Sequence, residues 1–150
     1  MNERKDSIAP DSSVPGYILV SRAPRIDACL HLRVSCGLTP RTAAQAELAL
    51  AGSWYMVHIL HLDSNKVVGM GRIIGDGGGY FHIVDIAILP EHQRRGLGDW
   101  IMHALIDHIK EEAPEGAYVN LIADLQGKKL YARHGFVETS PKAEGMERRF

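Results

Sequence analysis

Two arginines and two glycines stand between a strand-like segment and a helix-like segment, and their types and order suit the binding of a phosphate group. They lie in Gln93-Arg94-Arg95-Gly96-Leu97-Gly98. The first backbone N–H groups of a helix have no partner within it, and the helix dipole places partial positive charge at the same end. Glycine lets the backbone approach an anion closely. The segment therefore predicts a diphosphate site.

The elements on either side of this segment are predicted from their hydrophobic patterns. Residues 80–89 form a long apolar run closed by Pro90, which is typical of a strand. Downstream, apolar residues recur at the spacing of one helical face: Leu97, Ile101, Leu105 and Ile109. A strand, a short basic turn and a helix start would together present backbone N–H groups to a ligand.

Three common phosphate-binding motifs do not fit this segment. The sequence contains no G-x-x-x-x-G-K-[ST] string, so it is not a P-loop. A dinucleotide-binding fold requires a third glycine where this chain has Ile101. A protein kinase needs a longer chain and its aspartate motifs.

The segment and the strand before it resemble the acetyl-CoA site of the GNAT N-acetyltransferase superfamily. That signature is Q/R-x-x-G-x-G/A after a strand that reads hydrophobic-Ala-hydrophobic, and Ile86-Ala87-Ile88 followed by residues 93–98 matches every specified position. Near the C-terminus, Leu130-Tyr131-Ala132-Arg133-His134-Gly135-Phe136 is similar to the family's closing L-Y-x-x-x-G-F. The resemblance extends over about residues 17–150.

The order of the predicted elements agrees with the family's order. Strands are expected at 16–20, 54–62, 67–74, 80–89, 117–123, 136–138 and 146–150, and helices at 26–36, 39–52, 97–113 and 128–134. Thr39 and Pro40 are predicted to be the N-cap and first residue of the second helix. The resemblance implies an α+β GNAT fold, with a mixed and largely antiparallel central sheet of six to seven strands flanked by about four helices. Residues 16–150 would form the acetyltransferase domain, and the polar residues 1–15 a flexible N-terminal tail.

The resemblance also implies acetyl-CoA as co-substrate and assigns residues to it. In the family, the pantetheine amides pair with the main chain of the strand before the turn, which here comprises Ile86, Ala87 and Ile88. The pyrophosphate would be bound by Arg94, Arg95, Gly96, Leu97, Gly98 and Asp99. The family often has asparagine seven residues before its tyrosine, where this chain has Asp124. An ionised carboxylate accepts hydrogen bonds but cannot donate them, so this contact departs from the pattern.

Three residues are candidates for catalysis. Tyr131 matches the family tyrosine that protonates the leaving thiolate. His82 falls where arylalkylamine N-acetyltransferases have a histidine that relays protons, and Asp85 falls where glucosamine-phosphate acetyltransferases have an aspartate. Strand alternation places His82 and Asp85 on opposite faces, so both reach the acceptor only if a β-bulge lies between or beside them. Either residue is a candidate for removing the amine's proton. Asp85 is favoured as the larger contributor because a carboxylate beside the cofactor strand would also attract a cationic substrate. A structural pairing of Asp85 with Arg72 is an alternative.

Composition limits the class of protein. With 150 residues, 45% hydrophobic content and a net charge of −1, the chain suits one globular domain and does not favour a nucleic-acid partner. No apolar run is long enough to span a membrane, and the N-terminus has no signal-peptide pattern. Cys29 and Cys36 are predicted to stay reduced, which favours a cytoplasmic protein. The histidine spacing predicts no metal site.

The sequence leaves the acceptor open. The favoured reaction is transfer of acetyl from acetyl-CoA to a primary amine of a small molecule, by direct attack in a ternary complex. A protein or peptide N-terminal acetyltransferase is a second candidate, and a non-catalytic module that binds acyl-CoA is a third. A homodimer is compatible with all three.

Overall fold

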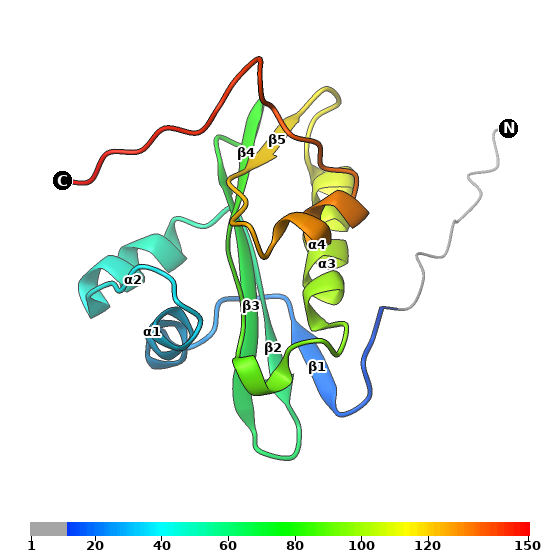
Figure 1. Ribbon diagram of the computed structural model, residues 1–150. Coiled ribbons are helices and arrows are strands. Elements are labelled where there is room, and N and C mark those ends of the chain that lie inside the picture. Colours follow the sequence, from blue (N-terminus) through cyan, green and yellow to red (C-terminus); the bar gives the residue numbers. More distant parts are fainter. Residues whose placement is uncertain (1–11) are drawn as a thin grey trace, which may run out of the picture.

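One twisted sheet forms the centre of the molecule, and helices cover both of its faces (Figure 1). The computed structural model describes residues 12–150. Its five strands lie in the order β1-β2-β3-β4-β5. They are β1 (Tyr17–Val20), β2 (Tyr55–His61), β3 (Lys66–Gly75), β4 (Tyr80–Ile88) and β5 (Tyr118–Leu121). Neighbours pair antiparallel except β4 and β5, which are parallel.

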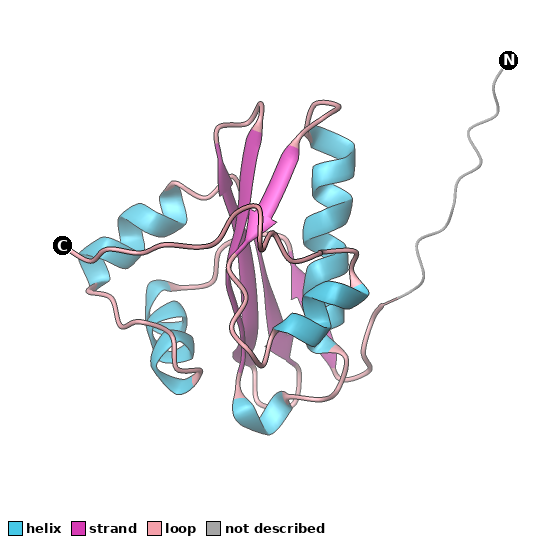
Figure 2. Ribbon diagram, turned by 45° about the horizontal axis from the view of Figure 1, so that its top comes forward, coloured by secondary structure: helices cyan, strands magenta, loops and turns pink. Residues whose placement is uncertain are grey.

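The helices lie in two layers, which Figure 2 shows from another side. Helices α1 (Ile26–Ser35) and α2 (Ala43–Ala51) cover one face, and α3 (Leu97–Glu112) and the short α4 (Lys128–Arg133) lie on the other. A 3-10 turn, η1 (Pro90–His92), connects β4 to the segment before α3. A large part of the core lies between α3 and the sheet, where Ile101 and Leu105 are fully buried with Ile73.

Two glycines of β3 allow α3 to lie close to the sheet. A Cβ at Gly71 would stand 2.5 Å from Cγ2 of Ile101, and one at Gly69 would stand 2.7 Å from Cδ1 of Ile88. The side chains of β4 and α3 therefore occupy the space above both positions. This packing fixes α3 relative to the end of β4, and with it the predicted diphosphate-binding segment at residues 93–96, called the phosphate turn below.

The second helix begins later than predicted. Its N-cap is Thr42, whose hydroxyl accepts from the backbone N–H of Gln45 at 3.1 Å, while the Gln45 side chain accepts from the N–H of Thr42 at 2.9 Å. This reciprocal pair of hydrogen bonds gives partners to backbone N–H groups at the helix start. A helix that began at Thr39 would lack this pair. Thr39 and Pro40 belong to the connection between α1 and α2.

The sheet has five strands rather than the predicted six to seven, because residues 136–138 and 146–150 form no strand. The last segment contains three consecutive charged residues, 147–149, and so has little apolar surface to bury against β5. Instead, Arg149 donates to the Thr39 hydroxyl at 3.1 Å, and the segment crosses towards α2 (Figure 1).

Part of the predicted N-terminal tail contacts the folded chain. Residues 1–11 lie outside the described residues, whereas the Ser12 hydroxyl hydrogen-bonds His103 of α3 and Val14 packs against the core. Val14 also lies beside Gly96, where its Cγ2 is 3.6 Å from the position of a Cβ. The chain thus passes next to the phosphate turn before β1 begins.

Candidate active site

The predicted phosphate turn leads into the first turn of α3, and its backbone is left-handed at two positions. Gly96 is the N-cap of α3 with φ +86°, and Arg94 has φ +60°. The Gln93 side chain donates to the carbonyl of Ile88 at 2.9 Å, which holds the turn against the end of β4. The first N–H groups of α3 are therefore directed into the space beside this turn.

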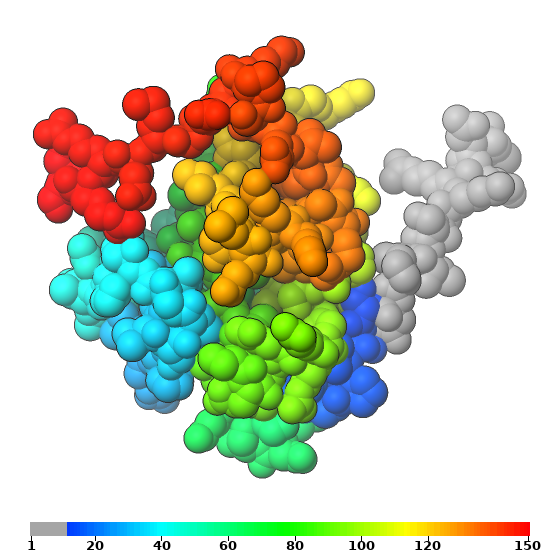
Figure 3. All heavy atoms as spheres, in the orientation of Figure 1, coloured from blue at the N-terminus to red at the C-terminus, as the bar shows by residue number. Residues whose placement is uncertain are grey.

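That space is a cavity of about 410 Å³ between the turn and α4. It is lined by residues of the turn, the first turn of α3, the end of β4 and α4: Ile88, His92, Gln93, Arg94, Gly96, Leu97, Gly98, Asp99, Gln126, Lys129, Leu130 and Arg133. In Figure 3 the green surface near residues 90–96 adjoins the orange surface of residues 122–133. Arg94, Lys129 and Arg133 give the cavity a cationic lining that suits a diphosphate.

Lys129, Arg133 and Gln126 were not singled out from the sequence. Lys129 and Arg133 are four residues apart on α4, so they share one face of the helix. This spacing was a usable signal, but the sequence alone does not show which part of the fold that face meets. The structure places it opposite the phosphate turn, about 30 residues away along the chain.

Contacts between α3 and α4 close one side of the cavity. The Asp99 carboxylate lies 2.8 Å from Nε2 of His134 and 3.1 Å from Nη2 of Arg133. Burial raises the pKa of the Asp99 carboxyl, but hydrogen bonds from Arg133 and His134 outweigh it, so the pKa lies below its usual value. Gly98 faces Leu130, whose Cδ2 would be 3.2 Å from an added Cβ. Asp99 thus joins the two helices while it lines the cavity.

Arg95 points away from the cavity. Its Nη1 donates to the Tyr17 hydroxyl at 3.1 Å, and its Nη2 donates to the carbonyl of Glu91 at 3.1 Å. Among residues 12–150, no comparable hydrogen bond holds the side chain of Arg94, which lines the cavity. The two adjacent arginines therefore have different surroundings.

Beyond Ile83, β4 has a free edge towards β5. The two strands pair only from Tyr80↔Tyr118 to Ile83↔Leu121, and Figure 1 shows β5 beside one end of β4 only. The N–H of Leu89 donates to the carbonyl of Val68 on β3. Because backbone groups alternate sides along a strand, Ala87 faces β3, whereas Ile86 and Ile88 face the gap. The backbone groups of Ile86 and the N–H of Ile88 can pair with an extended ligand, whereas the carbonyl of Ile88 already accepts from Gln93.

A β-bulge lies in β4 beside this edge. Met70 pairs with Ala87 but Arg72 pairs with Val84, so β4 has one extra residue there, and Asp85 has φ +58°. The Ile86 side chain lies against Gly71 on the α3 face, whereas Asp85 contacts Arg33 of α1. The bulge therefore brings Asp85 to the α1–α2 face, where alternation also places His82.

Asp85 is held in a buried ion-pair cluster with two arginines. Its Oδ1 lies 2.8 Å from Nη1 of Arg33, and its Oδ2 lies 2.8 Å from Nε of Arg72. Burial raises the pKa of the Asp85 carboxyl, but the hydrogen bonds and charges of Arg72 and Arg33 outweigh it, so the pKa is lower than usual. The cluster has a net charge of +1, which does not attract an ammonium group.

The same arginines connect α1, α2 and the segment between them to the sheet. Nε of Arg33 donates to the carbonyl of Thr39 at 2.7 Å, and Nη1 of Arg72 donates to the carbonyl of Ala49 at 3.3 Å. The bulge, the α1–α2 connection and the end of α2 are thus linked through one carboxylate. This link fixes the connection above the face that Asp85 and His82 share.

His82 hydrogen-bonds across the parallel strand pair. Its Nδ1 lies 2.6 Å from Oδ1 of Asn120 on β5. Because an amide oxygen only accepts, Nδ1 carries the proton in this arrangement, and Nε2 of a neutral ring then has a free lone pair. Among residues 12–150 there is no hydrogen-bond partner for Nε2. The geometry leaves that nitrogen able to accept a proton.

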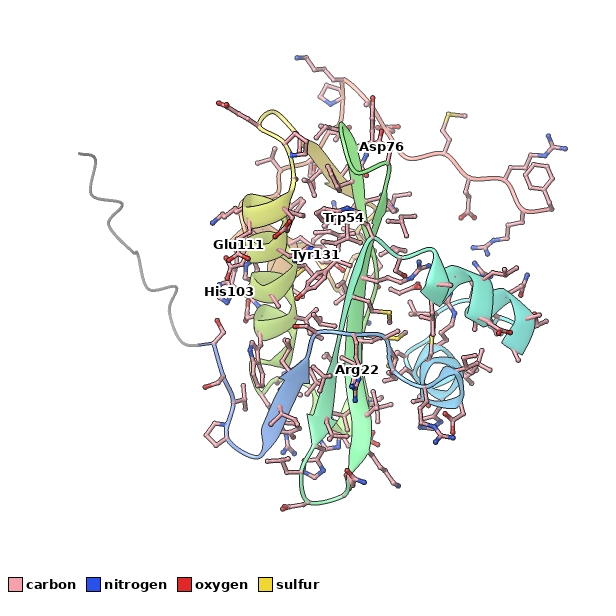
Figure 4. All side chains as sticks on the ribbon, turned by 180° about the vertical axis from the view of Figure 1, so that it is seen from behind. Arg22, Trp54, Asp76, His103, Glu111 and Tyr131 are labelled. Atoms are coloured by element: carbon pink, nitrogen blue, oxygen red, sulfur yellow. The ribbon has the colours of Figure 1, made fainter. Side chains whose placement is uncertain are left out.

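Tyr131 lies on α4, and its side chain packs against the core (Figure 4). It also lines a cavity of about 370 Å³ with Leu121 and Phe136. Burial, and then the nearby Asp124 carboxylate, raise the pKa of the Tyr131 hydroxyl above its ordinary value. The hydroxyl is therefore protonated at neutral pH, and among residues 12–150 it forms no hydrogen bond. It can donate to a ligand.

Asp124 has a local partner. Its Oδ1 accepts from the backbone N–H of Gly127 at 2.6 Å, just before α4 begins. A Cβ at Gly127 would lie 2.9 Å from that oxygen and 2.8 Å from Cε2 of Tyr131. Asp124 thus stabilises the turn that sets the Tyr131 ring in place.

Within residues 12–150, no group of three or more His, Cys, Asp or Glu side chains is arranged to hold a metal ion. No helix in this part of the chain has the length and apolar character needed to cross a membrane.

Comparison with known proteins identifies similar chains. The acetyltransferase (GNAT) domain family matches residues 39–149. An uncharacterised N-acetyltransferase of Porphyra purpurea is 28% identical over 114 residues, which are 75% of this chain and 64% of that protein. The chain therefore spans less than two thirds of the length of this curated relative.

Two solved structures share the fold. A protein of unknown function from meticillin-resistant Staphylococcus aureus, described as a probable acetyltransferase, is 36% identical with a TM-score of 0.84, and the match covers 89% of this chain and 99% of that one. Glucosamine-6-phosphate N-acetyltransferase from Arabidopsis thaliana is 18% identical with a TM-score of 0.66, and the match covers 89% and 99% of the two chains. The second likeness concerns the fold alone.

Proposed function

Because the chain belongs to the GNAT family of acetyltransferases, we propose that it transfers the acetyl group of acetyl-CoA to a primary amine of a small molecule in a ternary complex. Family membership and the α+β GNAT fold agree with the predictions from the sequence. The acceptor and the roles of individual residues are the parts that we propose.

One observation supports this function above the others: a cationic cavity at the start of α3 adjoins the free edge of β4. The cavity reaches Ile88, whose backbone N–H faces the same gap as the backbone of Ile86. A diphosphate at the α3 start and an extended amide chain along β4 are the two recognition elements of a pantetheine diphosphate. The residues present therefore fit acetyl-CoA, which would supply the activated acetyl group.

We assign the diphosphate to Arg94, Lys129 and the first N–H groups of α3. Arg94 has φ +60°, which directs the chain around the cavity, and Lys129 approaches from α4. Arg95 is assigned a supporting role, because its guanidinium is used by Tyr17 and Glu91. Asp99 holds Arg133 in place rather than contacting the anion, because the negative charges of its carboxylate and of the diphosphate would repel each other.

Tyr131 is proposed as the general acid for the departing thiolate. Its hydroxyl has a raised pKa and so keeps its proton at the pH where the reaction runs. His82 is proposed as the base, because Asn120 fixes the proton on Nδ1 and leaves Nε2 to accept the proton of the amine.

Asp85 is better suited to positioning than to proton transfer. Both of its oxygens are engaged by guanidinium groups at 2.8 Å, which weakens its basicity and its attraction for a cation. It fixes the bulge next to Ile86, and it holds α1 over the acceptor face through Arg33.

The test is thiol release from acetyl-CoA with purified protein and a panel of amines, which includes small primary amines, amino sugars and peptides with free N-termini. Acetylated small amines, identified by mass spectrometry, would support the proposal. Acetylation of peptides alone would favour a protein N-terminal acetyltransferase. Binding of acetyl-CoA without turnover of any amine would favour a non-catalytic module.

A further inference from the structure

A hydrogen-bonded cluster behind the phosphate turn contains two histidines that the acetyl transfer does not use. The hydroxyl of Tyr17, on β1, lies 2.7 Å from Nδ1 of His92 and accepts from Nη1 of Arg95 at 3.1 Å. The ring of His61, on β2, lies with its centroid 4.8 Å from that of His92 and 5.0 Å from that of Tyr17. Tyr17 is only 7% exposed. The cluster therefore joins the sheet edge to the turn.

The hydrogen bonds of the cluster are all satisfied when His92 is neutral. Arg95 can only donate, so it occupies one lone pair of the Tyr17 oxygen. In the arrangement that gives the Tyr17 proton an acceptor, Tyr17 donates to Nδ1 of His92, which is then unprotonated at that nitrogen. If His92 became a cation, both of its nitrogens would carry protons. The Tyr17 oxygen would then face two cationic donors, and its own proton would lose its acceptor.

We propose that Tyr17 and His92 are positioning residues for the phosphate turn, and that protonation of His92 weakens the contact of Tyr17 with Arg95 and, with it, the binding of a diphosphate ligand. The inference rests on the proposed acetyl-CoA site. His92 directly precedes the turn and lines its cavity, and Arg95 is also bonded to the carbonyl of Glu91. Loss of the Tyr17 contacts would remove one hydrogen bond from each end of the segment from His92 to Arg95 and leave Arg95 bonded only to the Glu91 carbonyl among residues 12–150.

The charges that face His92 favour its neutral form. Burial, the neighbouring His61 and the guanidinium of Arg95 lower the pKa of His92, while the Glu91 carboxylate opposes them. The Nδ1 of His61 is itself hydrogen-bonded to the Ser64 hydroxyl at 2.7 Å. Because the pKa of His92 lies below the ordinary histidine value of about 6.5, the cluster is intact at neutral pH and is lost on acidification below that value.

The experiment measures the dissociation constant of dephospho-CoA between about pH 8 and about pH 5 by isothermal calorimetry on the full chain. Dephospho-CoA has no 3′-phosphate, so the ligand does not titrate across this range. The variant is His92→Gln, whose amide oxygen can accept from Tyr17 but cannot become charged. His31→Gln is the matched control, because His31 is exposed on α1 and, among residues 12–150, its ring hydrogen-bonds only Ser35.

We expect the affinity of the wild-type protein and of the His31→Gln control to fall by about fivefold or more as the pH is lowered, and that of His92→Gln to stay nearly constant. A second variant, Tyr17→Phe, should bind weakly already at pH 8, with little further change in acid. Thermal melts at each pH would verify that all proteins are folded.

Equal pH dependence in the wild type and in His92→Gln would overturn the inference while leaving the acetyl-CoA site intact. So would unchanged affinity of a folded Tyr17→Phe at about pH 8. If the wild-type protein does not bind dephospho-CoA at any pH tested, the proposed acetyl-CoA site is incorrect, and the inference that depends on it is incorrect as well.

Discussion

Nη1 of Arg33 lies 2.8 Å from Oδ1 of Asp85, so α1 is joined by a buried ion pair to the bulge of β4. The side chains of Arg33 and Asp85 are 8% and 10% exposed. This contact holds α1 over the sheet, and it holds the Asp85 side chain of the bulge on the face that α1 and α2 cover. Removing either partner would leave an uncompensated charge in the protein interior.

Asp85→Asn should lower the free energy of unfolding by about 3–5 kcal/mol, because it leaves two buried guanidinium groups without their carboxylate. Urea denaturation followed by circular dichroism measures this loss. Asp27→Asn is the control, since Asp27 pairs with Arg25 at 3.2 Å and its side chain is 73% exposed. An exposed pair of this kind contributes about 1 kcal/mol or less. A loss for Asp85→Asn that is no larger than that of the control would contradict the buried cluster.

The Asp85 carboxylate should also make the stability of the protein depend on pH in the acidic range. The pKa of Asp85 is lower in the folded protein than its usual value, so its contribution is present above about pH 4 and is lost as the pH falls through the folded-state pKa. Denaturation midpoints measured from neutral pH downward should fall for the wild type. In Asp85→Asn the midpoint should fall less, because the part of the decrease that comes from protonation of Asp85 is absent. Parallel curves for the two proteins would show that Asp85 does not titrate differently on folding.

Gly96→Ala should raise the KM for acetyl-CoA by about tenfold, since the phosphate turn needs a left-handed residue at the α3 N-cap. Gly116→Ala provides the control. Gly116 has φ +82°, close to the +86° of Gly96, but it lies in the connection to β5. Both substitutions should cost about 1 kcal/mol of stability by forcing alanine into this conformation. If both also raised KM equally, the effect would arise from stability rather than from the phosphate turn.

Lys129→Gln should raise the KM for acetyl-CoA about threefold to tenfold with little change in kcat, because Lys129 contributes charge to the diphosphate cavity and is exposed. The effect should shrink as salt is added, since exposed charges are screened. Lys142→Gln removes an exposed lysine that does not line this cavity and should leave KM unchanged. Steady-state kinetics at low and high salt would measure the difference, and an equal response of both variants would rule out a specific role.

Tyr131→Phe should lower kcat by about 10²–10⁴-fold with little change in KM, because it removes the proton donor and keeps the ring. Tyr118→Phe serves as control, since Tyr118 is a half-exposed residue of β5. The raised pKa of Tyr131 predicts that kcat of the wild type declines only above about pH 10, where the hydroxyl loses its proton. A kcat for Tyr131→Phe within about twofold of the wild type would make this tyrosine structural.

The sequence by itself determined the family, the order of most elements and the place of the glycine-containing turn before α3. These features are local: the spacing of Leu97, Ile101 and Leu105 defines a helix face, and Gly96 marks the turn before it. Local patterns also indicated β4 and the segment around Tyr131. The expected closing strands at 136–138 and 146–150 were wrong because strand formation needs a partner edge and apolar surface, which a short pattern does not guarantee.

Only the tertiary structure decided what surrounds each candidate site residue. Arg94 and Arg95 are adjacent and alike in type, yet the turn directs one to the cavity and the other to Tyr17, which lies 78 residues earlier. Asp85 stands in sequence as a candidate base, but the bulge places it between Arg33 and Arg72. Lys129 joins the cavity because α4 packs against the start of α3. These are contacts between distant parts of the chain, and their energies depend on geometry and burial that residue spacing does not contain.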